Sequence, residues 1–205
     1  MTKYVVVATE RECLEAAAHI VGQTLSKVAY VGLTYEQPET VRWHFADWHW
    51  PEVGVELATS TGDLAYAIWD HEVSQHELTL ALGPMSDRWL PLRPDSLVSA
   101  RRWDVSDSEE WAPMVQNTID SCEVILGDVG NPPLSAPVAI RLQAGAGTAW
   151  IIVAGPISST EPPERLSGDR FFLGHDEVIV TFDDEVAGRL GVHRAEGHAE
   201  QPGTY

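Results

Sequence analysis

The stretch from Val53 to Asp70, VGVELATSTGDLAYAIWD, constrains the fold of this 205-residue chain more than any other. Val55 and Leu57 alternate with small or polar residues, and after a Thr/Ser/Gly/Asp cluster the alternation resumes through Tyr66 and Ile68. Alternation with a period of two is typical of a half-buried strand, and a cluster of turn residues between two such runs indicates a hairpin. The sequence therefore predicts two antiparallel strands joined by a short turn.

A second stretch, AIRLQAGAGTAWIIVAG at residues 139–155, repeats this pattern. The alignment places Leu142 on Leu57, Gly147 on Gly62, and Ile151 and Val153 on Tyr66 and Ile68. The apolar positions of both hairpins are expected to form the core of two sheets: Val55, Leu57, Tyr66, Ile68, Ile140, Leu142, Ile151 and Val153.

The segments around the two hairpins follow the same order. In the first half we expect a strand at residues 3–8, a helix from Thr9 to Gly22 with Leu14, Ala17, Ala18 and Val21 on its apolar face, and strands at 25–33 and 77–82. In the second half we expect a strand at 102–105, a short helix after Ser106 limited by Pro113, and strands at 118–125 and 177–182.

These elements predict an α+β fold of mainly antiparallel strands with short helices, in two pseudo-repeated halves. The first half spans residues 1–90, the second spans 91–190, and residues 191–205 form a flexible tail. Pro91 and Pro94 mark the boundary between the halves. The alternative to duplication is chance similarity between two β-rich stretches.

The composition limits the kind of partner. The formal net charge is −18, from 31 acidic and 13 basic side chains, which argues against direct binding of nucleic acid because phosphate backbones recruit Lys and Arg. The acidity serves either solubility or the recognition of a basic partner. Two cysteines are too few for a disulfide framework, and no stretch has the length and apolar character of a signal peptide or a membrane span. We therefore expect a cytoplasmic protein that does not associate with a membrane.

Aromatic and histidine residues are concentrated between residues 43 and 50. The candidate binding residues of this aromatic cluster are Trp43, His44, Asp47, Trp48, His49 and Trp50, with Phe45 among them. On an extended strand, Trp43, Phe45, Asp47 and His49 would share one side, and His44, Trp48 and Trp50 the other. The cluster fits either an aromatic strand packed into the core or a binding surface.

The same stretch offers little for a metal. His44 and His49 would point apart unless a turn intervenes, and no Cys or paired Glu-His spacing supplies further ligands. No GxSxG, GxxxxGK[ST] or strand-associated GxGxxG motif is present. The sequence therefore predicts no cofactor and no metal, and it favours a non-enzymatic protein over an enzyme.

Acidic residues form two groups in the second half. The first contains Asp104, Asp107, Glu109, Glu110 and Asp120, and the second contains Asp176, Glu177, Asp183, Asp184 and Glu185. Because the repeated order of elements would bring both groups to related places, we expect one acidic surface, with an exposed Trp as its anchor and Asp107, Glu109 and Glu110 as candidate binding residues.

This pattern favours an acidic, non-enzymatic protein-binding module, in its concrete form an immunity- or antitoxin-like protein that neutralises a basic partner. Two alternatives remain open. The first is a small-molecule-binding protein or enzyme that uses the aromatic cluster. The second is a structural subunit of a larger assembly.

A resemblance to other proteins covers most of the chain. It rests on Gly62, the run Trp103-Asp104-Val105, Trp111, the run Asp176-Glu177-Val178 and the pair Phe182-Asp183. On these residues the chain resembles an uncharacterised family of small bacterial α+β proteins. The resemblance implies no particular activity, because residues of this kind position strands and caps.

Overall fold

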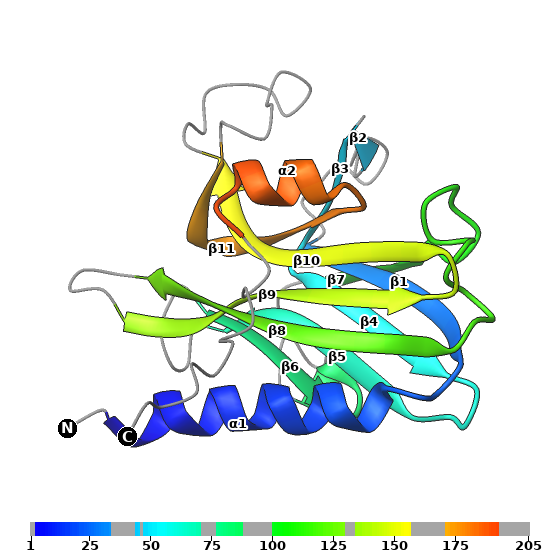
Figure 1. Ribbon diagram of the computed structural model, residues 1–205, viewed down its shortest axis with the longest axis horizontal. Helices are drawn as coiled ribbons and strands as arrows, with labels where there is room; N and C mark the ends of the chain where they lie inside the picture. The colour runs from blue at the N-terminus through cyan, green and yellow to red at the C-terminus, as the bar shows by residue number, and fades with distance from the viewer. Residues whose placement is uncertain are drawn as a thin grey trace, which may run out of the picture.

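The computed structural model describes residues 3–33, 44–45, 47–70, 77–87, 100–129, 134–156 and 171–192 (Figure 1). Its helices are α1 (Lys3–Ile20), α2 (Asp184–Arg189) and the 3-10 turn η1 (Met85–Asp87). A five-stranded sheet has the order β6-β5-β4-β1-β7, and a six-stranded sheet has the order β2-β3-β11-β10-β9-β8. The expected boundary around residues 91–99 and the tail after residue 192 lie outside the described residues.

The strands of the first sheet are β1 (Leu25–Leu33), β4 (Gly54–Thr59), β5 (Leu64–Asp70), β6 (Glu77–Leu82) and β7 (Ala100–Asp104). The strands of the second sheet are β2 (His44–Phe45), β3 (Trp48–Glu52), β8 (Ile119–Val129), β9 (Leu134–Ala144), β10 (Gly147–Pro156) and β11 (Phe171–Thr181). Every strand pair in the described part of the chain is antiparallel. Of the predicted mainly antiparallel strands with short helices, the strands are confirmed, as are the hairpins β4–β5 and β9–β10, whereas α1 has 18 residues and is not short.

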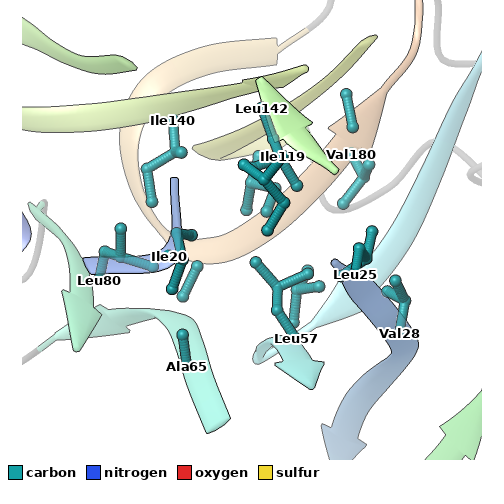
Figure 2. Close-up of a cluster of buried hydrophobic side chains, with 14 of the residues drawn as sticks. Ile20, Leu25, Val28, Leu57, Ala65, Leu80, Ile119, Ile140, Leu142 and Val180 are labelled. Carbon is teal, nitrogen blue, oxygen red and sulfur yellow. The ribbon is translucent and has the colours of Figure 1, made fainter. Parts of the chain in front are cut away.

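The two sheets pack face to face and share one apolar core. Side chains from both sheets meet there, including Val28, Leu57 and Leu80 from the first sheet and Ile140 and Val180 from the second (Figure 2). A further apolar cluster, on the other face of the second sheet, packs against α2. The alternating apolar residues that predicted half-buried strands thus form the inner faces of a β-sandwich.

The helix α1 lies along one side of the sandwich, against β6 and β8, the edge strands of the two sheets (Figure 1). It buries a stripe of small residues, Cys13, Ala16 and Ala17, together with Ile20. The Cys13 thiol donates to the Leu78 carbonyl at 3.6 Å and accepts from the Leu80 amide at 3.2 Å, so the helix satisfies part of the free edge of β6.

Two predictions at this end of the chain are wrong. Residues 3–8 are the first turns of α1 and not a strand, because docking on two sheet edges decides the conformation of a run that is locally ambiguous. The predicted apolar face is also displaced: of its four residues only Ala17 is buried, while Leu14 and Val21 are 51% and 40% exposed. The small residues of the helix face the core because they allow a close approach to the strands.

The short helix expected after Ser106 is also wrong. Residues 106–116 form turns that connect β7 of the first sheet to β8 of the second. Pro113 has no backbone N–H to continue a helix. Trp111 and Met114 are nonetheless fully buried, so the apolar residues that suggested a helix cover one end of the core instead.

The two halves contribute strands in the same order, β6-β5-β4-β1 and β11-β10-β9-β8. Val28 pairs with Leu57 in the first sheet, and Cys122 pairs with Leu142 at the aligned place in the second. The first strand of each set has a register irregularity near its start, after Leu25 and after Ile119. Two segments join the sheet formed mainly by the other half: β2 and β3, from the first half, lie in the second sheet, and β7, from the second half, lies in the first.

The alignment of the second hairpin strands is off by one residue. Tyr66 and Ile68 are buried in a separate cluster on the opposite face of the first sheet, whereas Ile151 and Val153 lie in the shared core. The reason is the turn: the first hairpin pairs Ala58 with Leu64, but the second continues its pairing to Ala144 and Gly147. A one-residue difference exchanges the two faces of a strand.

Candidate functional site

The candidate site lies away from α1, where β1 of the first sheet approaches β3 of the second (Figure 1). Tyr30 of β1 points into this region, is fully buried, and meets the rings of His49, Trp103 and Trp111 edge-on. Phe182, directly after β11, packs edge-on against both His49 and Trp111. Aromatic rings from four parts of the chain thus fix the floor of the site.

The two histidines of the aromatic cluster lie together because a turn intervenes between them. β2 and β3 form a hairpin in which His44 pairs with His49 and Phe45 pairs with Trp48. The imidazole centroids are 4.8 Å apart. The grouping expected for one extended strand is therefore wrong: the turn at Asp47 brings His44 and His49 to one side and Phe45 and Trp48 to the other.

Most of the aromatic cluster belongs to the core. Phe45 stacks on Trp48 with ring centroids 4.4 Å apart, and Trp50 packs beside them on the face covered by α2. No Trp in the described part of the chain is exposed, so the expected exposed Trp anchor is not found there. Trp43 lies outside the described residues.

The segment between β7 and β8 carries Glu110 to the site and is held to β1 at both ends. The Val105 amide donates to the Val28 carbonyl at 3.0 Å, and the Gln116 amide donates to the Leu25 carbonyl at 2.6 Å. Glu110 Oε1 then lies 3.3 Å from His44 Nε2 and 3.5 Å from His49 Nε2. His44 is half-exposed, whereas His49 is 1% exposed.

A buried chain of polar contacts leads inward from Glu110. The Trp111 indole N–H, which can only donate, bonds the Tyr30 hydroxyl at 2.7 Å, and that hydroxyl lies 2.7 Å from His49 Nδ1. The Trp111 indole N–H and the Tyr30 O–H both have an acceptor when the Tyr30 hydroxyl donates to His49 Nδ1. The imidazole proton then lies on Nε2, facing the Glu110 carboxylate.

Burial sets the charges of these groups. It lowers the pKa of His49 from 6.5 to about 4, and the nearby Glu110 carboxylate only partly offsets that effect. Burial alone would raise the pKa of Glu110, but a backbone N–H and the two imidazoles outweigh it and the pKa is lowered. Burial also raises the pKa of Tyr30. At neutral pH the site therefore holds a neutral His49, a protonated Tyr30 and an anionic Glu110.

A hollow of about 190 Å³ opens beside these residues. It is lined by Asp47, Trp48, His49, Glu110, Phe182 and Asp183. The buried Thr181 hydroxyl donates to the Asp47 carbonyl at 2.8 Å and so ties the β2–β3 turn to the end of β11. Three acidic residues, from three separate segments, thus line one hollow, and the described lining contains no Lys or Arg.

The predicted acidic residues divide into several groups. Glu110 and Asp183 reach the hollow, and Asp107 and Glu109 are exposed on the segment that carries Glu110. Asp104 pairs with Lys27, Asp184 with Arg141, and Glu185 with Arg189. Asp183 also caps α2, accepting from the Glu185 and Val186 amides.

Sequence reasoning missed Tyr30, Phe182 and the polar role of Trp111. Each falls in an apolar pattern that predicts core packing, and each is indeed at least partly buried. The available signal was chemical: Tyr and Trp carry a polar atom that needs a partner when buried.

No known family model, curated protein or solved structure matches this chain. The resemblance to a small bacterial family stays a prediction. No described helix has the length and apolar character needed to cross a bilayer.

Proposed function

We propose that this chain is an acidic, non-enzymatic protein-binding module that recognises a basic partner by taking a Lys or Arg side chain into the hollow. Its concrete form is an immunity- or antitoxin-like protein that neutralises this partner. The observation that carries the proposal is the convergence of Asp47, Glu110 and Asp183 on a hollow with no Lys or Arg among its described lining residues.

Five described cations elsewhere in the chain are already paired with carboxylates, which supports the proposal that the hollow receives a cation from a partner. Arg11, Lys27, Arg102, Arg141 and Arg189 each lie beside a carboxylate. Clustered like charges in a concave site focus the local field and raise the rate at which oppositely charged groups arrive. The carboxylates of the hollow therefore suit a cation supplied by a partner.

The polar chain behind the hollow suits a binding site better than a catalytic one. Its order of carboxylate, imidazole and hydroxyl is that of an activated nucleophile. However, the hydroxyl belongs to Tyr30, which is 0% exposed and already accepts from Trp111. A substrate has no access to that oxygen, so the chain of contacts holds His49 and Glu110 in place.

The proposal is tested by comparative capture from the native cell with three baits. The first is the unmodified chain. The second is D47N/D183N, in which Asn keeps the cap of α2. The third is E15Q/D128N, which removes two exposed carboxylates on α1 and β8 and so matches the change in net charge. We expect a basic protein that is captured by the first and third baits and lost from the second.

Two results would count against the proposal. One is the recovery of no basic protein by the unmodified chain. The other is equal loss of the partner from both variants, which would show that net charge and not the hollow governs binding.

A second candidate function is the binding of a small organic cation. Trp48, His49 and Phe182 line the hollow beside the carboxylates, and aromatic faces attract cations. Saturable binding of a small amine by the unmodified chain, without capture of a protein, would favour this alternative. The third possibility, a structural subunit, would show as a stable assembly insensitive to D47N/D183N.

We also propose that the two halves are pseudo-repeats and that the protein is cytoplasmic. The common strand order and the matched pairs Val28–Leu57 and Cys122–Leu142 support the duplication. Two free cysteines support a reducing compartment.

A further inference from the structure

We propose that His44, His49 and Glu110 bind a divalent transition-metal ion of the Zn²⁺ class. The potential ligand atoms of these three side chains all lie within 4.8 Å of one another. They come from β2, β3 and the segment between β7 and β8, so the fold brings them together from distant positions. The inference goes beyond the proposed function, because it requires no protein partner. It takes Glu110 as a metal ligand and leaves Asp47 and Asp183 of the hollow for a partner's cation.

The separations of Glu110 from the two histidines fit shared coordination. Glu110 Oε1 lies 3.3 Å from His44 Nε2 and 3.5 Å from His49 Nε2. Charge-assisted N–H···O bonds are shorter, at about 2.7–2.9 Å. Two ligands held at about 2.0–2.1 Å from a tetrahedral Zn²⁺ lie about 3.3–3.4 Å apart. Both observed separations are close to this ligand–ligand distance.

The second oxygen of Glu110 supplies an independent observation. Glu110 Oε2 is buried and has no hydrogen-bond partner among the described residues. A buried carboxylate oxygen without a partner is costly and calls for an explanation. A metal ion beside Oε1 would compensate this charge and could be shared by both oxygens.

The surroundings of His49 resemble those of a metal ligand. Histidines that bind a metal through one nitrogen usually hold the other in a hydrogen bond that fixes the ring. His49 has this arrangement, with Nδ1 2.7 Å from the Tyr30 hydroxyl and with Phe182 edge-on against its ring. Metal binding at Nε2 moves the imidazole proton to Nδ1, and Tyr30 serves either state because its oxygen both donates and accepts.

The donor set selects the kind of ion. Two imidazoles and one carboxylate suit Zn²⁺, Co²⁺ or Ni²⁺, whereas Ca²⁺ and Mg²⁺ prefer oxygen ligands alone. Three protein ligands leave the fourth tetrahedral position for water or another exchangeable group. The hollow beside His49 and Glu110 provides the space for that group.

The test is calorimetric titration of the untagged full chain with Zn²⁺, with Co²⁺ absorption to report the coordination geometry. We expect one tetrahedral ion per chain, and binding at least about tenfold weaker in His44→Ala and in Glu110→Gln. His19→Ala is the matched control, because His19 is also half-exposed and lies 3.3 Å from a carboxylate, that of Asp63, on another part of the surface. It should leave the affinity unchanged.

The inference is overturned if the chain binds no ion up to millimolar Zn²⁺, or if His44→Ala holds the ion as tightly as His19→Ala does. These results are separable from a failure of the proposed function. D47N/D183N retains all three ligands and should still bind the ion, whereas His44→Ala retains the carboxylates of the hollow and should still capture a basic partner.

Discussion

The replacement Tyr30→Phe tests the buried polar chain that positions the site. The phenyl ring keeps the edge-on contacts with His49, Trp103 and Trp111, and only the hydroxyl is lost. That hydroxyl serves the Trp111 indole N–H and His49 Nδ1, both at 2.7 Å. Trp111 is 0% exposed and His49 is 1% exposed, so water cannot replace the missing partner without a change in structure.

Each buried polar group left without a partner costs about 1–3 kcal/mol. Tyr30→Phe leaves two such groups, so the free energy of unfolding should fall by roughly 2–6 kcal/mol in urea melts with EDTA present and an unchanged m-value. Ile119→Val is the control, since it removes one carbon from the same core and should cost about 0.5–1.5 kcal/mol. A loss in Tyr30→Phe no larger than that of the control would refute the hydrogen-bonded chain.

Three further predictions concern the core, the pH response and the acidic surface. Leu57→Ala and Ile151→Ala should each lower the free energy of unfolding by about 2–5 kcal/mol in denaturant melts, because both side chains are buried in the shared core. The free energy of unfolding should fall as the pH drops from 6.5 to 4, because unfolded His49 takes up a proton that folded His49, with a pKa of about 4, does not. The loss is on the order of 2–3 kcal/mol, and melts in EDTA should show a smaller loss in His49→Gln. Charge reversal of the exposed Asp107 and Glu109 should slow association with a captured basic partner and weaken its salt dependence in stopped-flow measurements, with little effect on stability.

The strands and hairpins could be predicted from the sequence because their signals are local. Alternation through Val55 and Leu57 reports a strand with one face toward the core, and the turn residues that follow report the reversal of the chain. The bounds of β1 and β6 follow from such runs. The buried face of β5, the second strand of this hairpin, could not be assigned in the same way. A turn that differs by one residue in length decides whether Tyr66 or its neighbours Ala65 and Ala67 face the shared core.

The helix α1 illustrates the limit of local pattern. Its first residues include a run of three valines, which favours a strand by propensity. The conformation is decided by contact with the edges of both sheets, where Cys13 bonds to β6. That contact joins residues far apart in the sequence and leaves no periodic signal.

The candidate site was only partly predictable for the same reason. The density of Trp and His near residue 48 marks the segment, but the pairing of His44 with His49 depends on a turn that alternation alone does not reveal. Glu110 approaches them because its segment is bonded to β1, a strand of the other sheet. The convergence of these groups is a property of the sandwich and not of any single stretch.

The central claim, that the hollow receives a basic side chain from a partner, is tested most directly by zero-length carbodiimide cross-linking of the captured complex followed by peptide mass spectrometry. This reagent joins a carboxylate to a lysine amine only when the two groups touch. We predict cross-links between a lysine of the partner and Asp47, Glu110 or Asp183, and their loss in D47N/D183N. Cross-links confined to remote carboxylates such as Glu15 and Asp128 would contradict the account.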